Sequence, residues 1–180
     1  DRYQRIIDGA RMVIDNWKPE IEIDEEWEEF KVEEIVKLSS GKGLTKDSMI
    51  PGKYPVYGGN GINGYHNKYL LQDANIVIGR VGAYCGVTTI TEPMSWVTDN
   101  GLYVAKFLKE VDLRYFEYIL NFMNINKYAK VGGQPSISQE TVYNIKIPLP
   151  NLPIQRAISE KLLIQENYIN ANKRIIKEIE

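Results

Sequence analysis

Residues 75–90 read NIVIGRVGAYCGVTTI, in which two apolar runs, 75–79 and 86–90, flank a glycine-rich turn. β-Branched residues dominate both runs, and short runs of this kind bounded by glycine are typical of strands. The intervening glycines permit the tight backbone geometry that a turn requires. The segment therefore predicts two strands joined by a loop that carries one arginine, Arg80, and one tyrosine, Tyr84.

The pattern on both sides of this segment is also mostly β. Strand-like runs occur at 54–57, 102–107 and 143–150, the last of them ended by Pro150. Between them, Asp112 is a typical N-cap residue for a helix from Leu113 to about Tyr128, with Leu113, Phe116, Leu120 and Met123 on one face. We expect an α+β fold, in which a mostly β body contains one internal helix.

A second kind of pattern occupies the two ends of the chain. Apolar residues recur at helical spacing over residues 3–17, at Tyr3, Ile6, Ala10, Val13 and Trp17, and Pro19 ends this helix. The acidic stretch 20–27 that follows is expected to be an extended, solvated connector. The chain begins without Met and stops at Glu180 within a helical pattern, so we expect a piece of a longer protein.

The last segment, 151–180, predicts a long helix that Pro153 opens in its first turn. Its apolar and polar residues alternate in steps of four and three, which is the period of a coiled-coil seam. Polar residues within a seam cost stability but specify the register and the partner of the helix. We therefore expect a partner or dimer helix. The alternative is an amphipathic helix that lies on its own domain. The seam residues are Ile158, Leu162, Gln165, Ile169, Asn172, Ile176 and Ile179.

The composition excludes several classes of protein. The sequence has one cysteine and one histidine, which rules out a disulfide framework, a cysteine-rich zinc site and any site that needs two histidines. No apolar run has the roughly 18 to 20 residues that a membrane-spanning helix needs, so we expect a soluble cytoplasmic protein that makes no membrane contact.

The formal net charge of −2 conceals an uneven distribution. Residues 1–35 carry 5 basic and 12 acidic side chains, a net charge of −7, whereas residues 36–150 carry 12 and 8, a net charge of +4. Residues 151–180 carry 5 and 4, a net charge of +1. The β body is therefore mildly basic, as expected for a domain that contacts nucleic acid.

Three glycine-rich loops are candidate binding elements. Residues 59–64 match G-x-G-x-x-G, but no βαβ unit surrounds them, so a tight turn is a better interpretation than a dinucleotide site. In the loop 79–86, Arg80 presents a planar fork that suits guanine or phosphate, and an ion pair with Asp99 is the alternative. In the loop 132–138, Gln134 can read adenine and Ser136 can bind phosphate or a base.

No catalytic constellation is found. The lone His66 is more typical of a structural residue than of a general base, and Cys85 is best interpreted as a small core residue. The sequence contains no Walker loop, no serine elbow and no Asn-Pro-Pro-Tyr methylase motif. We therefore expect no enzymatic activity and no metal site in this chain.

An ordered series of short motifs resembles the specificity (S) subunit of type I restriction-modification systems. The order and spacing of the motifs carry the resemblance, which covers one target recognition domain and the long helix after it. The motifs are Tyr54-Pro55-Val56-Tyr57-Gly58-Gly59-Asn60-Gly61, Ile76-Val77-Ile78-Gly79-Arg80-Val81-Gly82, Thr98-Asp99-Asn100, Gly133-Gln134-Pro135-Ser136-Ile137-Ser138, and Ile145-Lys146-Ile147-Pro148-Leu149-Pro150 followed by Pro153, Gln155 and Arg156.

The resemblance implies a non-catalytic, sequence-specific DNA-binding subunit that takes part in defence against foreign DNA. It implies an N-terminal helix and acidic connector at 1–26, a target recognition domain at 27–150 that reads one half of a bipartite site, and a conserved spacer or dimerisation helix at 151–180. Combined with the loop analysis, it points to these DNA-binding candidates: Lys42, Asn60, Asn63, Arg80, Tyr84, Lys130, Gln134 and Ser136.

The resemblance also implies partners. The helices would dock methyltransferase (M) subunits, the restriction (R) subunit would join through the complex, and S-adenosylmethionine would be bound by the methyltransferase rather than by this chain. The family pattern has two recognition domains, whereas this chain has one, so a second recognition domain in cis or a homodimer is expected.

Two other functions remain open at this point. The chain could be a protein-interaction adaptor whose helices assemble a complex and whose β body binds a peptide or glycan; such a protein needs no positive surface at the three loops. An enzyme that uses Arg80, Tyr84 and His66 would require these three side chains to share one pocket.

Overall fold

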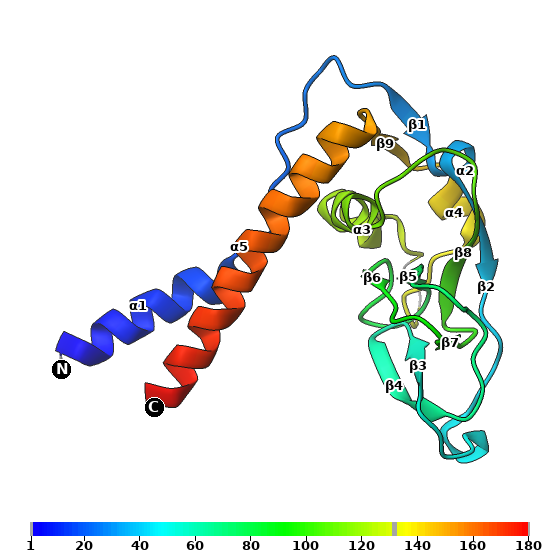
Figure 1. The fold of residues 1–180 in the computed structure, drawn as a ribbon, viewed down its shortest axis with the longest axis horizontal. Coiled ribbons are helices and arrows are strands. Elements are labelled where there is room, and N and C mark those ends of the chain that lie inside the picture. Colours follow the sequence, from blue (N-terminus) through cyan, green and yellow to red (C-terminus); the bar gives the residue numbers. More distant parts are fainter. Residues whose placement is uncertain (1, 131–132, 180) are drawn as a thin grey trace.

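The computed structural model describes residues 2–130 and 133–179 of the chain. Two long helices, α1 (Arg2–Asn16) and α5 (Leu152–Ile179), lie on one side of the molecule, and a β body lies on the other (Figure 1). Helix α3 (Leu113–Phe122) lies between α5 and the sheets. The predicted α+β class is confirmed.

The centre of the body is a four-stranded antiparallel sheet in the order β2-β8-β5-β6. Its strands are β2 (Val36–Ser40), β8 (Gly101–Phe107), β5 (Ile76–Gly79) and β6 (Thr88–Ile90). Ile76 pairs with Ile90 across β5 and β6, which confirms the two strands predicted within 75–90. β6 begins two residues later than expected because Gly86 turns the chain with a φ of +84°.

A three-stranded sheet in the order β4-β3-β7 lies beside it, with strands β3 (Tyr54–Gly58), β4 (Gly61–His66) and β7 (Trp96–Val97). β3 and β4 form an antiparallel hairpin whose two turn residues are Gly59 and Asn60. The G-x-G-x-x-G string is therefore the turn and the beginning of a returning strand, which confirms the predicted tight turn.

A two-stranded antiparallel sheet closes the body where the chain enters and leaves it. Glu29 of β1 (Glu29–Lys31) pairs with Pro148 of β9 (Lys146–Pro148). The short helices α2 (Val32–Ile35) and α4 (Gln139–Tyr143) lie next to this pair. The predicted strand over 143–150 is too long, because the Ser138 side chain accepts a hydrogen bond from the Thr141 amide and begins α4 there.

The internal helix is also shorter than predicted. Asp112 caps α3 as expected, since its side chain accepts from the Tyr115 amide. The helix ends at Phe122, and Asn124 adopts left-handed geometry with φ 49° and ψ 62°. The chain then continues as the 3₁₀ turn η2 (Ile125–Tyr128), which occupies the rest of the predicted helical range; a second such turn, η1 (Lys46–Ser48), follows β2.

The main hydrophobic core lies between α3 and the four-stranded sheet and extends to the short helices. Tyr115, Phe116, Ile119 and Leu120 of α3 are buried in it together with residues of β2, β5 and β8. Ile21 of the acidic connector is only 6% exposed and belongs to the same core. The expectation of a fully solvated connector is therefore wrong at this residue.

Helix α5 changes its surroundings along its length. Its first half packs on the body, where Gln155, Ser159 and Leu162 are buried. Its second half packs against α1, where Ile14 and Ile176 line one small cavity. On α1, Ile6 and Val13 of the predicted stripe are 60% and 67% exposed. Over the part of the chain that the structure describes, no helix is long and apolar enough to cross a membrane.

Candidate nucleic-acid interface

The three glycine-rich loops converge on one end of the β body. A Cβ at Gly79 would lie 2.6 Å from the carbonyl oxygen of Gly59, so only glycine permits this approach of two backbones. The Gly82 amide donates to the Pro135 carbonyl at 2.9 Å, and Val81 forms an isolated β-bridge with Ser136. Segments that are far apart in sequence therefore form one continuous surface.

Arg80 is fixed at the centre of this surface. Its amide donates to the carbonyl of Asn100 at 2.9 Å, and its carbonyl accepts from the Ile137 amide at 2.8 Å. The guanidinium donates from Nη1 to Ser40 Oγ at 2.9 Å. The alternative of an ion pair with Asp99 is not found between these two residues, and the buried Nε of Arg80 has no hydrogen-bond partner within the described ranges.

Other predicted residues gather around Arg80. The amide of Lys130 donates to the Ser136 carbonyl at 2.8 Å, which holds the two sides of the third loop together. The Gln134 amide nitrogen lies 3.4 Å from the position that a Cβ at Gly82 would take. Tyr84, on the Arg80 loop, is 48% exposed. The first glycine of the third loop as predicted, Gly132, lies outside the described residues.

The remaining predicted residues flank this cluster on neighbouring segments. Lys42 lies in a short segment that is attached to the 97–101 turn: its amide donates to Val97 at 2.9 Å, and its carbonyl accepts from Trp96 Nε1 at 3.0 Å. Asn60 lies at the turn of the β3–β4 hairpin, and Asn63 lies in β4. All three side chains are exposed.

A cleft adjoins this surface, and sequence reasoning did not predict it. It has a volume of about 510 Å³ and is lined by Lys46, Asn63, Asp99 and Asn100 among others. Three of these four residues were not among the candidates, although Asp99-Asn100-Gly101 is a typical turn sequence between strands. The turn could be expected from the sequence, but its position beside η1 depends on tertiary structure.

His66 and Cys85 are both buried within the fold. His66 is 5% exposed, its Nδ1 accepts from the Ile50 amide at 3.0 Å, and its ring lies edge-on to Trp96 at 5.6 Å. Cys85 is buried, and burial raises the pKa of its thiol. Within residues 2–130 and 133–179, no group of three or more His, Cys, Asp or Glu side chains could hold a metal ion.

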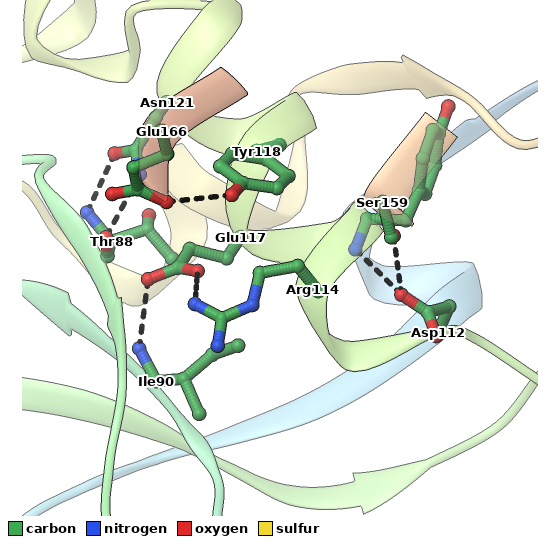
Figure 2. A network of polar contacts seen from close by, with 10 residues as sticks. Thr88, Ile90, Asp112, Arg114, Glu117, Tyr118, Asn121, Ser159 and Glu166 are labelled. Carbon is green, nitrogen blue, oxygen red and sulfur yellow. Dashed lines mark hydrogen bonds and ion pairs between the residues drawn. The ribbon is translucent and has the colours of Figure 1, made fainter. Parts of the chain in front are cut away.

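A polar network fixes α5 to the body through helix α3 (Figure 2). Asp112 accepts from Ser159 Oγ at 2.6 Å, and its own amide donates to Gln155 at 2.9 Å. Further along, the Tyr118 hydroxyl donates to Glu166 at 2.7 Å. Burial raises the pKa of the Tyr118 hydroxyl, and its hydrogen bond to the Glu166 carboxylate adds to the shift.

A second face of α3 is bonded to strand β6 in the same view (Figure 2). Glu117 accepts from the Ile90 amide at 3.1 Å and from Arg114 at 2.9 Å, and Asn121 exchanges two hydrogen bonds with the backbone of Thr88. Burial raises the pKa of the Glu117 carboxyl, although Arg114 partly offsets this effect. Helix α3 therefore links the sheet to α5.

The predicted seam residues of α5 lie apart from the loop surface, on the other side of the molecule (Figure 1). Leu162 is 1% exposed within the core, and Ile158 packs against the same core. Ile169, Asn172 and Ile176 are half-buried, whereas Gln165 and Ile179 are exposed. Within this chain, five of the seven seam residues are therefore buried or half-buried, whereas Gln165 and Ile179 are not.

The fold and the loop surface define a class of protein: a β body with clustered loops, fixed to a pair of long helices. Residues 24–180 match the family described as type I restriction modification DNA specificity domain. The chain belongs to this family.

Individual relatives agree with this assignment. The chain is 27% identical over 150 residues to the type I restriction enzyme EcoprrI specificity subunit of Escherichia coli, covering 79% of this chain and 37% of the relative. It is 28% identical over 195 aligned positions to the MjaVIII specificity subunit of Methanocaldococcus jannaschii, covering 88% and 44%.

Solved structures share the fold. The S subunit of a type I restriction-modification system from M. genitalium superposes with a TM-score of 0.69 at 21% identity, covering 82% of this chain and 41% of that one. The HsdS subunit from Thermoanaerobacter tengcongensis superposes with a TM-score of 0.66 at 14% identity. The match covers 96% of this chain and 47% of that one. A chain from a structure of type I R-M complex assembly superposes with a TM-score of 0.75 at 15% identity. The match covers 99% of this chain and 50% of that one. This chain thus spans between 37% and 50% of the length of these relatives.

Proposed function

We propose that this chain is a non-catalytic, sequence-specific DNA-binding part of a type I restriction-modification complex and reads one half of a bipartite site. The observation that carries the proposal is the convergence of three glycine-rich loops around Arg80 on a body with a net charge of +4. The family assignment supplies the type of complex.

The residue types on this surface suit the recognition of duplex DNA. Lysines such as Lys42 and Lys130 position a protein on phosphates, because ammonium groups bind the backbone without regard to sequence. Arg80, Gln134 and Asn60 carry side chains that pair with base edges in the major groove. Asn63, Tyr84 and Ser136 complete the proposed contact surface. Arg80 in the second glycine-rich loop and Lys130, two residues before the third, argue against the adaptor alternative.

The division of the chain follows from the same proposal. Residues 1–26 form the end of a helical region, residues 27–150 form the recognition domain, and residues 151–180 form the spacer helix. The network from Asp112 and Tyr118 to α5 supports this division, since it holds the spacer helix at a fixed orientation to the loops.

The partners are proposed from the family and from the length of the chain. Methyltransferase subunits would dock on the helices and bind S-adenosylmethionine, and the restriction subunit would join through the complex in the cytoplasm. The chain spans about half the length of its solved relatives, which supports either a second recognition domain in cis or pairing of two copies.

A binding titration tests the DNA-recognition proposal. We expect the chain, alone or with its methyltransferase subunit, to bind random duplex DNA with an affinity that falls as salt rises. Lys42→Ala should reduce the slope of log affinity against log salt by about one, because one phosphate contact is lost. Lys109→Ala is the matched control, since Lys109 lies over the Phe30 ring beside β1. Absence of salt-dependent binding under both conditions would overturn the proposal.

The role of the seam has its own test. Asn172 donates to the Tyr168 carbonyl in its own helix at 2.7 Å and is half-buried. If the polar seam residues specify a partner, Asn172→Leu should change the oligomeric state or the register rather than stability alone. Sedimentation velocity measures this, and an unchanged sedimentation coefficient would contradict the proposed role.

A further inference from the structure

The cleft beside the loop surface is lined by one acidic side chain, Asp99, and one basic side chain, Lys46. Its lining comes from three separate segments: the stretch 43–49 with Lys46, strand β4 with Asn63, and the turn with Asp99 and Asn100. The cleft adjoins the Arg80 loop, because the Asn100 carbonyl accepts from the Arg80 amide. The two features therefore belong to one face of the protein.

The backbone that carries Asp99 is held on both sides. The Thr98 amide donates to the Tyr57 carbonyl at 2.8 Å, and the Gly101 amide returns to the Thr98 carbonyl at 3.0 Å. The Thr98 hydroxyl oxygen is buried and has no hydrogen-bond partner in the described part of the chain. A turn fixed in this way can present a side chain in a constant position.

The Asp99 carboxylate itself is free to accept. Asp99 is exposed, and no ion pair or hydrogen bond engages its carboxylate among residues 2–130 and 133–179. It lies 3.8 Å from the position that a Cβ would take at Gly43, so it points along the segment that also carries Lys42 and Lys46. Neither Lys42 nor Lys46 therefore forms an ion pair with Asp99.

A carboxylate is the wrong group for the DNA backbone, since it repels phosphate. In the major groove, its complement is an exocyclic amino group, which cytosine offers at N4 and adenine at N6. Asn63 and Asn100 lie in the same cleft and can donate to neighbouring base acceptors. One carboxylate beside two side-chain amides suits a base edge better than it suits a phosphate.

We propose that Asp99 is a specificity-determining residue that accepts a hydrogen bond from the exocyclic amino group of one base in the target. The inference rests on the proposed DNA-binding function and deepens it. In this arrangement Lys46 contacts the phosphate next to that base, and the cleft provides the space into which the base edge projects.

Selection from a randomised duplex library, with the chain and its methyltransferase subunit, tests the inference. The wild-type protein should enrich a motif with one position restricted to C or to A, and the base found there identifies the amino group. Asp99→Ala should reduce the preference at that single position by about tenfold or more. If the wild-type base is cytosine, Asp99→Asn should shift the preference to adenine; if it is adenine, Asp99→Asn should retain it, because an amide pairs with adenine in a bidentate manner.

Asp47→Ala is the matched control, because Asp47 is exposed in η1 between Lys46 and Ser48 yet does not line the cleft. It removes the same charge and should leave the motif unchanged. If Asp99→Ala raises the affinity for all sequences and preserves the motif, the inference is overturned while the DNA-binding function stands. If the wild-type protein enriches no motif, the proposed function fails first.

Discussion

The Tyr118 hydroxyl donates a 2.7 Å hydrogen bond to the Glu166 carboxylate, which joins the middle of α3 to the middle of α5. Tyr118 is 4% exposed, so the bond is formed at the edge of the core rather than in open solvent. Hydrogen bonds to charged groups are stronger than those between neutral groups. This contact therefore helps to fix the angle between the β body and the long helix.

Replacing this tyrosine should weaken the attachment of α5. Tyr118→Phe removes the hydroxyl and leaves the ring, so we expect a loss of about 1.5 kcal/mol in the free energy of unfolding. Urea denaturation measures the loss. Tyr168→Phe is the control, because Tyr168 is 70% exposed on α5, the helix that carries Glu166, and should have no effect. Equal values for the two variants would contradict the proposed contribution.

The second attachment point can be tested by a double-mutant cycle. Ser159 is 6% exposed and donates to Asp112 at 2.6 Å, while Asp112 also caps α3. We expect Ser159→Ala to cost about 1 kcal/mol, and Asp112→Ala to cost more because both bonds are lost. The serine substitution should cost clearly less in the Asp112→Ala background, and strict additivity of the two losses would argue against direct coupling.

The buried Glu117 carboxyl predicts a pH dependence of stability. Burial raises its pKa above the ordinary value near 4.5 in the folded protein, so the folded state holds this proton to a higher pH than the unfolded state does. The contribution of this group to stability is therefore present at low pH and is lost as the pH rises through and above that value. Glu117→Gln, which cannot ionise, should gain stability relative to wild type between pH 4 and pH 7.

Urea denaturation at the two pH values checks this prediction. Glu160→Gln controls for the loss of one negative charge, because Glu160 is an exposed residue of α5. A difference between Glu117→Gln and wild type that is independent of pH would show that the carboxyl contributes no pH dependence.

Gly86 should be intolerant of substitution for two reasons. Its φ is +84°, and a Cβ there would lie 2.7 Å from the Asn126 amide nitrogen. We expect Gly86→Ala to cost about 2 to 3 kcal/mol, since backbone strain and a clash combine. Gly133→Ala separates the two effects, because Gly133 has a φ of +73° with no atom within 4 Å and should cost about 1 kcal/mol. Equal thermal shifts in the two variants would exclude a steric contribution at Gly86.

Local signals in the sequence predicted much of the fold. Asp112 was recognisable as a helix cap, and the apolar runs around Arg80 were recognisable as strands, because each depends on neighbouring residues only. The strand β4 was missed although a Gly59-Asn60 pair between two runs is a typical hairpin signal. The helix end at Asn124 was also missed, although an Asn directly after the last apolar helical residue is a typical helix-end signal.

The proposed binding surface was predictable only in part. Arg80 and Gln134 stand in glycine-rich strings that suggest exposed loops, so their residue type and context pointed to them. Asp99 and Lys46 belong to segments about fifty residues apart, and the strand pairing of β3 with β7 and of β2 with β8 brings them to one cleft. Such long-range pairings are not encoded in any short stretch of sequence.

The pairing of β1 with β9 has a consequence for how such chains can be recombined. Glu29 lies opposite Pro148, so the chain enters and leaves the β body side by side, at one short antiparallel pair of strands. An exchange of the body at this closure would also have to preserve the contacts of α3 with α5, in which Asp112 accepts from Ser159 and Tyr118 donates to Glu166.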